Sequence, residues 1–292
     1  MDVRTDGVDP ETRTTEPDVR RLATFLGALV LLGGILIIAS RFTDMSMVAL
    51  APVYMFTPLL AGLAVCLVYG IRFRAVGVRL GRPRWQAVSA IAALPLVGLT
   101  IAFAVAVPDV GFDATADPLP GMALPSGVAG LAAGIALVLG IGVTINAVFA
   151  FGEEFGWRGY LLWELAPLGF WKASVVIGAL WGVWHAPVIL DGYNYPSFPL
   201  VGVVAMTVAC ISFSPVYTYL VLRAESVFAA ALLHGVFNAA AGAVLVFTVA
   251  DEPILAELVA SPVGLAGVAA FGLAAAAIAV AGAPTLDRSF AM

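Results

Sequence analysis

The sequence predicts an all-α, polytopic membrane protein: a helical bundle of about eight transmembrane helices with both termini in the cytoplasm. Composition is the first reason, because 62% of the 292 residues are hydrophobic and only 11% are charged, whereas soluble domains carry about 25% charged residues. The second reason is a series of apolar stretches of about 20 residues, the length that crosses a bilayer as a helix. The third reason is a one-sided distribution of positive charge.

Eight spans are expected, and short polar segments or Gly- and Pro-containing turns separate them. They lie at residues 22–40, 47–70, 87–107, 130–162, 171–190, 199–222, 227–249 and 262–283. The fourth is longer than a simple span and contains a cluster of charged residues. No internal repeat or linker divides the chain, so residues 22–283 are expected to form one membrane domain.

The two ends of the chain are expected to be tails. Residues 1–21 contain six acids and four arginines, which predicts a disordered polar segment. Because this segment is too long and too acidic for the start of a signal peptide, the first span is expected to be retained. Residues 284–292 are expected to be a short C-terminal tail.

The orientation follows from the positive charges. With the N-terminus inside, 13 of the 14 Lys and Arg residues fall in the tails, the inner loops or the inner ends of spans, and only Arg41 falls outside. Five of the 13 lie in residues 71–86, whereas the outer loops 108–126, 191–198 and 250–261 contain none. Cytoplasmic loops of membrane proteins are enriched in Lys and Arg. The asymmetry therefore predicts that both termini face the cytoplasm.

Several classes of partner and cofactor are disfavoured by what the chain lacks. No basic block alternates with aromatic residues, so nucleic acid is not an expected partner. The two cysteines, Cys66 and Cys210, lie apart in apolar segments, where a thiol behaves as a small hydrophobic group. Neither a disulfide framework nor a cysteine-based zinc site is expected.

Polar residues interrupt three of the spans. Both histidines of the chain, His185 and His234, lie within apolar stretches, as does the sequence Glu153-Glu154-Phe-Gly-Trp-Arg158. Ionisable groups inside spans are costly and usually face a protein interior or a water-filled cavity where they function. Counted along each helix, Glu153 and the two histidines lie about 16–20 Å from a charge on the cytoplasmic side. We therefore expect one buried polar chamber that opens toward the cytoplasm.

Helical spacing assigns partners within this chamber. Glu154 and Arg158 are four residues apart and are expected to form an ion pair, while Glu153 points about 100° away and is left without that partner. His234 and Asn238 share a face of the seventh span. Further candidates for the chamber wall are Asn146, Trp157 and Trp181, and the two tryptophans have simple packing as the alternative.

This set of side chains suits hydrolysis in two alternative ways. Glu153 can act as general base on a water molecule that His185 holds, while His234 and Asn238 stabilise an oxyanion. Alternatively, Glu153, His185 and His234 can bind Zn²⁺ as a His₂Glu site with one position left for water. No cofactor is required by the first scheme, and the sequence leaves both open.

The three motifs resemble those of the CPBP family of intramembrane proteases, also called the Abi family. This family includes type II CAAX prenyl endopeptidases and bacteriocin-processing or immunity proteins. Its pattern is EExxxR, FxxxH and then HxxxN or HxxxD on successive spans, and residues 130–250 of this chain contain EExxxR, WxxxH and HxxxN in that order. Trp181 stands where the family has Phe. Each motif is short, but three in the correct order and spans are specific.

The resemblance implies an intramembrane endopeptidase that cleaves a membrane-anchored or prenylated protein or peptide. Glu153 would activate water with help from His185, and His234 with Asn238 would stabilise the oxyanion. Glu154 and Arg158 would be structural or would orient the substrate. The plasma membrane is the expected location, and the oligomeric state is not predicted. The alternatives are a proton-coupled transporter, which also uses buried ionisable residues, and a non-catalytic membrane scaffold or immunity protein.

Overall fold

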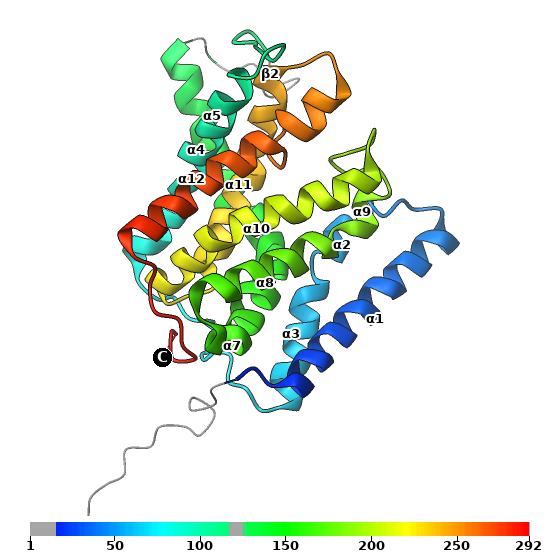
Figure 1. The fold of residues 1–292 in the computed structure, drawn as a ribbon, viewed down its shortest axis with the longest axis vertical. Coiled ribbons are helices and arrows are strands. Elements are labelled where there is room, and N and C mark those ends of the chain that lie inside the picture. Colours follow the sequence, from blue (N-terminus) through cyan, green and yellow to red (C-terminus); the bar gives the residue numbers. More distant parts are fainter. Residues whose placement is uncertain (1–15, 117–124, 126, 292) are drawn as a thin grey trace, which may run out of the picture.

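A computed structural model describes residues 16–116, 125 and 127–291 as a bundle of helices (Figure 1). The α-helices are α1 (Val19–Thr43), α2 (Ala51–Tyr54), α3 (Thr57–Val68), α4 (Pro83–Val105), α5 (Gly127–Ile141), α6 (Ala147–Glu154), α7 (Leu162–Leu165), α8 (Gly169–Trp184), α9 (Ala186–Ile189), α10 (Pro199–Ala224), α11 (Phe228–Phe247) and α12 (Leu265–Ala281). Two-residue strands β1 (Gly111–Phe112) and β2 (Thr248–Val249) pair antiparallel. The predicted all-α class is confirmed.

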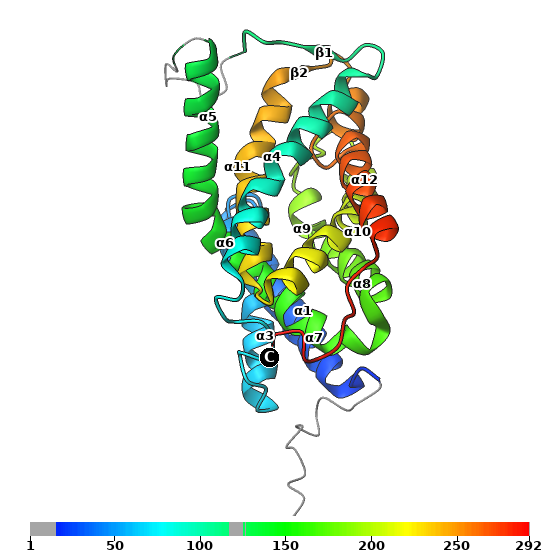
Figure 2. The same cartoon turned by 90° about the vertical axis from the view of Figure 1, so that its left-hand side faces the viewer.

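Six helical stretches of the described residues are long and apolar enough to cross a membrane, and the protein is an integral membrane protein. The expected count of eight differs in two places. The fourth and fifth expected spans fall in one nearly continuous helical run, 127–189, and the eighth corresponds to the shorter apolar helix α12. Helix α5 lies at the edge of the bundle and exposes Val128 and Leu131, as a lipid-facing helix does (Figure 2).

Three segments of π-helix or 3₁₀-helix shape the long run 127–189. The π-helices η2 (Gly142–Asn146) and η3 (Phe155–Leu161) flank α6, and the 3₁₀-helix η4 (Ala166–Leu168) turns the chain into α8. A further π-helix, η5 (Ile254–Val259), precedes α12. Because π-helical turns cluster at functional sites, the position of η3 directly after Glu153 and Glu154 marks that segment as a candidate site.

Close helix crossings depend on two glycines that face each other. A Cβ on Gly235 of α11 would lie 2.4 Å from the carbonyl oxygen of Gly142, and a Cβ on Gly142 would lie 2.6 Å from the Cα of Val236. Neither distance is tolerated between real atoms, so only glycine permits this approach. The crossing brings the His234 segment of α11 against α6.

One end of the bundle, which we call the acidic end, is formed by the loops after α1, after α9 and after β2. Three hydrogen bonds join these loops: Met47 N donates to Asp191 Oδ2 at 2.6 Å, Ser197 N donates to Glu257 Oε2 at 3.1 Å, and Tyr195 Oη donates to Val263 O at 2.8 Å. The loop around β1 also lies at this end, because β1 pairs with β2. The loops of this end carry many acidic residues: Asp44, Asp109, Asp113, Asp191, Asp251, Glu252 and Glu257.

The opposite end, which we call the basic end, holds both described chain ends, the loop 69–82 and the turn between α7 and α8. The loop contacts the last turn of α10, because Arg82 N donates to Ala224 O at 2.8 Å, and the C-terminal segment, because Arg79 Nη1 donates to Ala291 O at 2.9 Å. Helix α10 therefore runs from the acidic end to the basic end.

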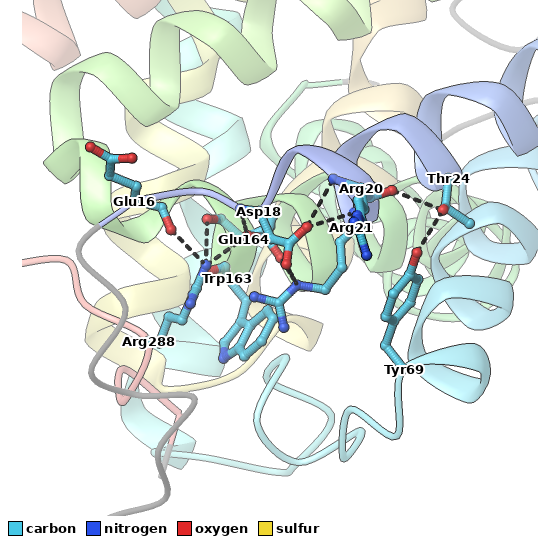
Figure 3. A network of polar contacts seen from close by, with 9 residues as sticks. All are labelled: Glu16, Asp18, Arg20, Arg21, Thr24, Tyr69, Trp163, Glu164 and Arg288. Atoms are coloured by element: carbon cyan, nitrogen blue, oxygen red, sulfur yellow. Dashed lines mark hydrogen bonds and ion pairs between the residues drawn. The ribbon is translucent and has the colours of Figure 1, made fainter.

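A buried charge network fastens the two chain ends to α7 (Figure 3). The carboxylate of Glu164 is fully buried, and it binds Arg21 Nε at 2.9 Å and Arg288 Nη2 at 2.6 Å. Both guanidinium groups also lie over the Trp163 ring, 5.2 Å and 4.7 Å from its centroid. Glu164 thus links the start of α1, the end of α7 and the C-terminal segment.

The tails differ from expectation because of this network. Residues 1–15 of the expected disordered tail lie outside the described part of the chain, but α1 begins at Val19 with Asp18 accepting hydrogen bonds from Arg20 N and Arg21 N. These contacts cap the helix and lower the pKa of the Asp18 carboxyl, first through the Arg21 amide. At the other end, the expected C-terminal tail packs on the bundle and buries Arg288.

We expect the substitution Glu164→Gln to cost about 3 kcal/mol of unfolding free energy, because it leaves two buried guanidinium groups without their shared carboxylate. Thermal unfolding in detergent measures the effect. The matched control is Glu225→Gln, which removes a pair with the half-exposed Arg82 and should cost less than about 1 kcal/mol. Equal small effects of both substitutions would show that Glu164 does not hold the chain ends.

Candidate active site

A cavity of about 110 Å³ lies inside the bundle, where α6, α8, α10 and α11 meet. Its wall contains four of the predicted site residues, together with Trp181. The lining residues that bear on the chemistry are Glu153, Trp181, His185, Tyr217, His234 and Asn238, and those toward the acidic end are Ala51, Met55, Tyr193, Asn194 and Val263. Three separate motifs thus converge on one pocket, as predicted.

Glu153 projects from α6 into the pocket and is only 3% exposed. Its Oε2 accepts a hydrogen bond of 2.7 Å from Trp181 Nε1. The sequence predicted that Glu153 has no partner. Arg158 is indeed paired with Glu154 and not with Glu153, but Trp181 is a partner of Glu153. Trp181 was expected as a wall residue. Its hydrogen bond fixes one carboxylate oxygen of Glu153 and thereby the orientation of the whole carboxylate. The carboxylate is therefore held in place by a neutral donor.

Glu154 and Arg158 form the predicted ion pair, with Arg158 Nη1 3.1 Å from Glu154 Oε2. Both side chains are fully buried, and neither lines the pocket. The guanidinium carbon of Arg158 lies 4.2 Å from the Trp181 ring centroid and 4.6 Å from that of Tyr217. Sandwiched in this way, Arg158 supports the pocket wall from behind.

His234 connects this ion pair to the pocket. Its Nδ1 lies 2.9 Å from Glu154 Oε1, and since a carboxylate only accepts, Nδ1 carries the proton. The Nε2 atom remains for the pocket that His234 lines. Glu154 therefore sets the tautomer and orientation of His234, in the way that a carboxylate commonly orients a functional histidine.

His185 lies at the C-terminal end of α8, directly before the short helix α9 that Pro187 initiates. Its Nδ1 is 2.8 Å from the carbonyl oxygen of Trp181, which only accepts, so Nδ1 is again the donor. The ring is half-buried and lines the pocket. Both histidines thus use Nδ1 for the protein and keep Nε2 for a ligand.

Asn238 follows His234 by one helical turn and also lines the pocket. Unlike the other motif residues, it is exposed. Its amide is therefore the most accessible polar group among the motif residues of the wall.

Two predicted pocket residues are placed elsewhere. Asn146, at the end of η2, donates from Nδ2 to Gly235 O at 3.4 Å and is absent from the pocket lining. Trp157 is fully buried behind the pocket, in edge contact with Phe25 and Trp184. Asn146 thus joins α11 to η2, and Trp157 has the packing role that was its alternative.

Sequence reasoning did not find two tyrosines of the wall. Tyr54 donates its hydroxyl to Trp184 O at 2.8 Å and stacks on the Trp184 ring. Tyr217 of α10 is fully buried, and its hydroxyl has no hydrogen-bond partner among the described residues. Neither belongs to a motif. A polar tyrosine in the middle of an apolar span was the only sequence signal for Tyr217.

A His₂Glu zinc site was the alternative scheme for these residues. In the described part of the chain, no group of three or more His, Cys, Asp or Glu side chains gathers closely enough to hold one ion. Glu153, His185 and His234 line the same pocket without forming such a group, and each histidine has its Nδ1 engaged with the protein. The chemical steps proposed below use no metal.

The position of the entrance disagrees with part of the expectation. Pocket residues that lie in loops or beside them, namely Tyr193, Asn194, Ala51 and Val263, all belong to the acidic end. The entrance and the termini therefore cannot both face the cytoplasm, because the termini lie at the basic end. The sequence did not predict this, because the depth of each site residue was counted only from the basic charges. His185 is six residues from Asp191, about 9 Å along a helix.

The motif region is similar to a known protein family. Residues 135–240 match the family model of type II CAAX prenyl endopeptidase Rce1-like proteins. A stretch of 49 residues is 41% identical to the CAAX prenyl protease 2 of Methanococcus maripaludis; it covers 16% of this chain and 18% of that protein. The chain thus matches less than a fifth of this relative's length. Because residues 135–240 include all three motifs, the resemblance read from them is confirmed over this region.

Proposed function

Starting from the Rce1-like motif region at residues 135–240, we propose that this protein is an intramembrane endopeptidase of the CAAX prenyl protease type. Its substrate is a membrane-anchored protein or peptide, of which a prenylated chain is one form, and its location is the plasma membrane. The observation that carries the proposal is the convergence of Glu153, His185, His234 and Asn238 on one pocket from three separate helices.

The first step is the activation of water. Glu153 as carboxylate takes a proton from a water molecule, while His185 Nε2 accepts the second O–H and orients it. The water oxygen then forms a bond to the scissile carbonyl carbon as the C=O π bond opens to an oxyanion. Trp181 keeps the Glu153 carboxylate in one rotamer through its 2.7 Å hydrogen bond, which limits the reorganisation that the step requires.

The second step is stabilisation and collapse of the oxyanion. Asn238 Nδ2 donates to it, and His234 donates through Nε2 when both ring nitrogens carry protons. Glu154 at 2.9 Å balances the charge of that imidazolium. Glu153 returns its proton to the leaving nitrogen as the C–N bond breaks, so that one water is consumed and a carboxylic acid and an amine form. The acid then gives its proton to the amine, and a carboxylate and an ammonium group are released.

The test is a comparison of protein termini in membrane fractions from cells that express the wild type or Glu153→Gln. New termini that depend on Glu153 would identify the substrate and its scissile bond. The matched control is Glu225→Gln, a change of the same chemistry at the basic end far from the pocket, which should preserve every terminus. Identical termini in wild type and Glu153→Gln would sink the proposal.

Tyr217 provides a further prediction, because it lines the pocket and its buried hydroxyl has no hydrogen-bond partner among the described residues. We expect it to bind the substrate carbonyl or the oxyanion, so Tyr217→Phe should lower kcat about 10-fold to 100-fold, with KM changed much less. Steady-state cleavage of the peptide identified above measures both constants.

Tyr160→Phe is the control for that experiment. Tyr160 is also fully buried with an unpartnered hydroxyl, but it packs against Phe25 and does not line the pocket. Its loss should leave kcat and KM unchanged. Equal effects of the two substitutions would assign Tyr217 to packing alone.

A further inference from the structure

The residues of the pocket lining that lie in loops or beside them all belong to one end of the bundle, the acidic end. Residues near its mouth come from α2 and from the loops that follow α9 and η5: Ala51, Met55, Tyr193, Asn194 and Val263. These loops are tied to each other by the Asp191, Glu257 and Tyr195 hydrogen bonds that define the acidic end. Tyr193 is 40% exposed, so the mouth reaches the surface there.

Toward the basic end, buried side chains close the pocket. Trp157, Arg158 and Glu154 are fully buried behind the wall formed by Trp181 and Tyr217. Among the residues that line the pocket, none belongs to the loop 69–82, to α7 or to the C-terminal segment. A substrate therefore has no described route to Glu153 from the basic end.

Charge determines which end faces the cytoplasm. Of the twelve Lys and Arg residues in the described part of the chain, only Arg41 lies at the acidic end, whose described loops carry seven acids. The loop and helix start at 71–86 alone holds five arginines, of which Arg82 contacts the end of α10 and Arg79 contacts the C-terminal segment. Positive loops stay in the cytoplasm. The basic end is therefore the cytoplasmic one.

From these two observations we infer that the pocket receives its substrate from the extracytoplasmic side of the membrane. Resting on the proposed protease function, this narrows the substrate class. The scissile bond belongs to a membrane-anchored protein segment exposed at the outer face, and not to a lipidated C-terminus on the cytoplasmic face. His185 and Asn238, the two more accessible motif residues, lie on the approach to this mouth.

Site-directed labelling tests the direction of opening without any need for activity. The two native cysteines are buried and are first replaced by alanine. Asn194→Cys then marks the mouth and Arg74→Cys marks the basic end, where Arg74 is exposed. A membrane-impermeant maleimide added to intact cells should label N194C, and should label R74C only after the cells are permeabilised. Ser197→Cys, also exposed at the acidic end, replaces N194C if that variant does not fold.

The reverse labelling pattern would overturn the inference and place the mouth in the cytoplasm, while leaving the protease proposal intact. A second measurement ties the mouth to catalysis. Treating intact cells with the maleimide should stop the Glu153-dependent cleavage in the N194C variant, relative to its own untreated activity, and should leave R74C cells unaffected. Continued cleavage by fully labelled N194C protein would show that the substrate enters elsewhere.

Discussion

Replacing Glu153 by Gln is expected to reduce kcat by at least about 1000-fold, because a glutamine cannot take the proton of the attacking water. The fold should be retained. Gln has the same shape, its carbonyl oxygen can still accept the 2.7 Å hydrogen bond from Trp181, and a neutral amide is cheaper to bury than a carboxylate. We therefore expect the unfolding temperature to stay the same or to rise.

Activity is measured as cleavage of the peptide that spans the identified scissile bond, with the purified protein in liposomes. Thermal unfolding of the same preparation is followed by fluorescence of its six tryptophans. Glu153→Asp is a useful companion, because it keeps the carboxylate but shortens its reach, so part of the activity should return. Full activity in Glu153→Gln would exclude Glu153 as the base, and a large loss of stability would favour a structural role.

Replacing the neighbouring Glu154 by Gln is the same chemical change, but it is expected to lower both the stability and the activity of the protein. Glu154 is fully buried and binds Arg158 at 3.1 Å and His234 at 2.9 Å. Gln leaves the buried guanidinium without a counter-ion, at a cost of about 3–5 kcal/mol in unfolding free energy. It also removes the charge that balances a protonated His234, so activity should fall about 100-fold.

The double substitution Glu154→Gln with Arg158→Met separates these two effects. Removing the guanidinium as well removes the uncompensated buried charge, so most of the stability should return. Activity should stay low, because His234 still lacks its carboxylate. Unfolding temperature and kcat are measured for both single variants and for the double variant. If activity recovers together with stability, Glu154 and Arg158 serve only the fold.

The difference between these two adjacent glutamates was only partly predictable. Spacing of four residues predicted the Glu154–Arg158 pair, because neighbours on a helix surface are fixed by its geometry. The same reasoning left Glu153 without a partner. Its actual donor, Trp181, is 28 residues away on α8, and His234, the second partner of Glu154, is 80 residues away on α11. No local pattern encodes contacts of that separation.

The positions of Asn146, Trp157 and Tyr217 also depend on contacts between residues that are distant in the sequence. Helical phase placed Asn146 in the pocket, but the Gly142–Gly235 crossing turns it toward the backbone of α11. Trp157 was a pocket candidate with packing as its alternative, and it packs against α1 through Phe25. Tyr217 was missed because its span carries no motif. Which face of an apolar helix meets the pocket depends on its neighbours, and hydropathy does not identify them.

By itself, the sequence determined that this is a helical membrane protein with one strongly positive side, and it predicted that two glutamates, two histidines and an asparagine lie close together. Composition and the price of burying charge in lipid decide those points. Only the tertiary structure decided what holds Glu153, how Glu154 orients His234, and where the pocket opens. The depth of a residue along a helix follows from the local sequence, whereas the position of an entrance depends on which loops meet. Here the loops after α1, α9 and β2 lie beside the pocket, and contacts between residues distant in the sequence hold them there.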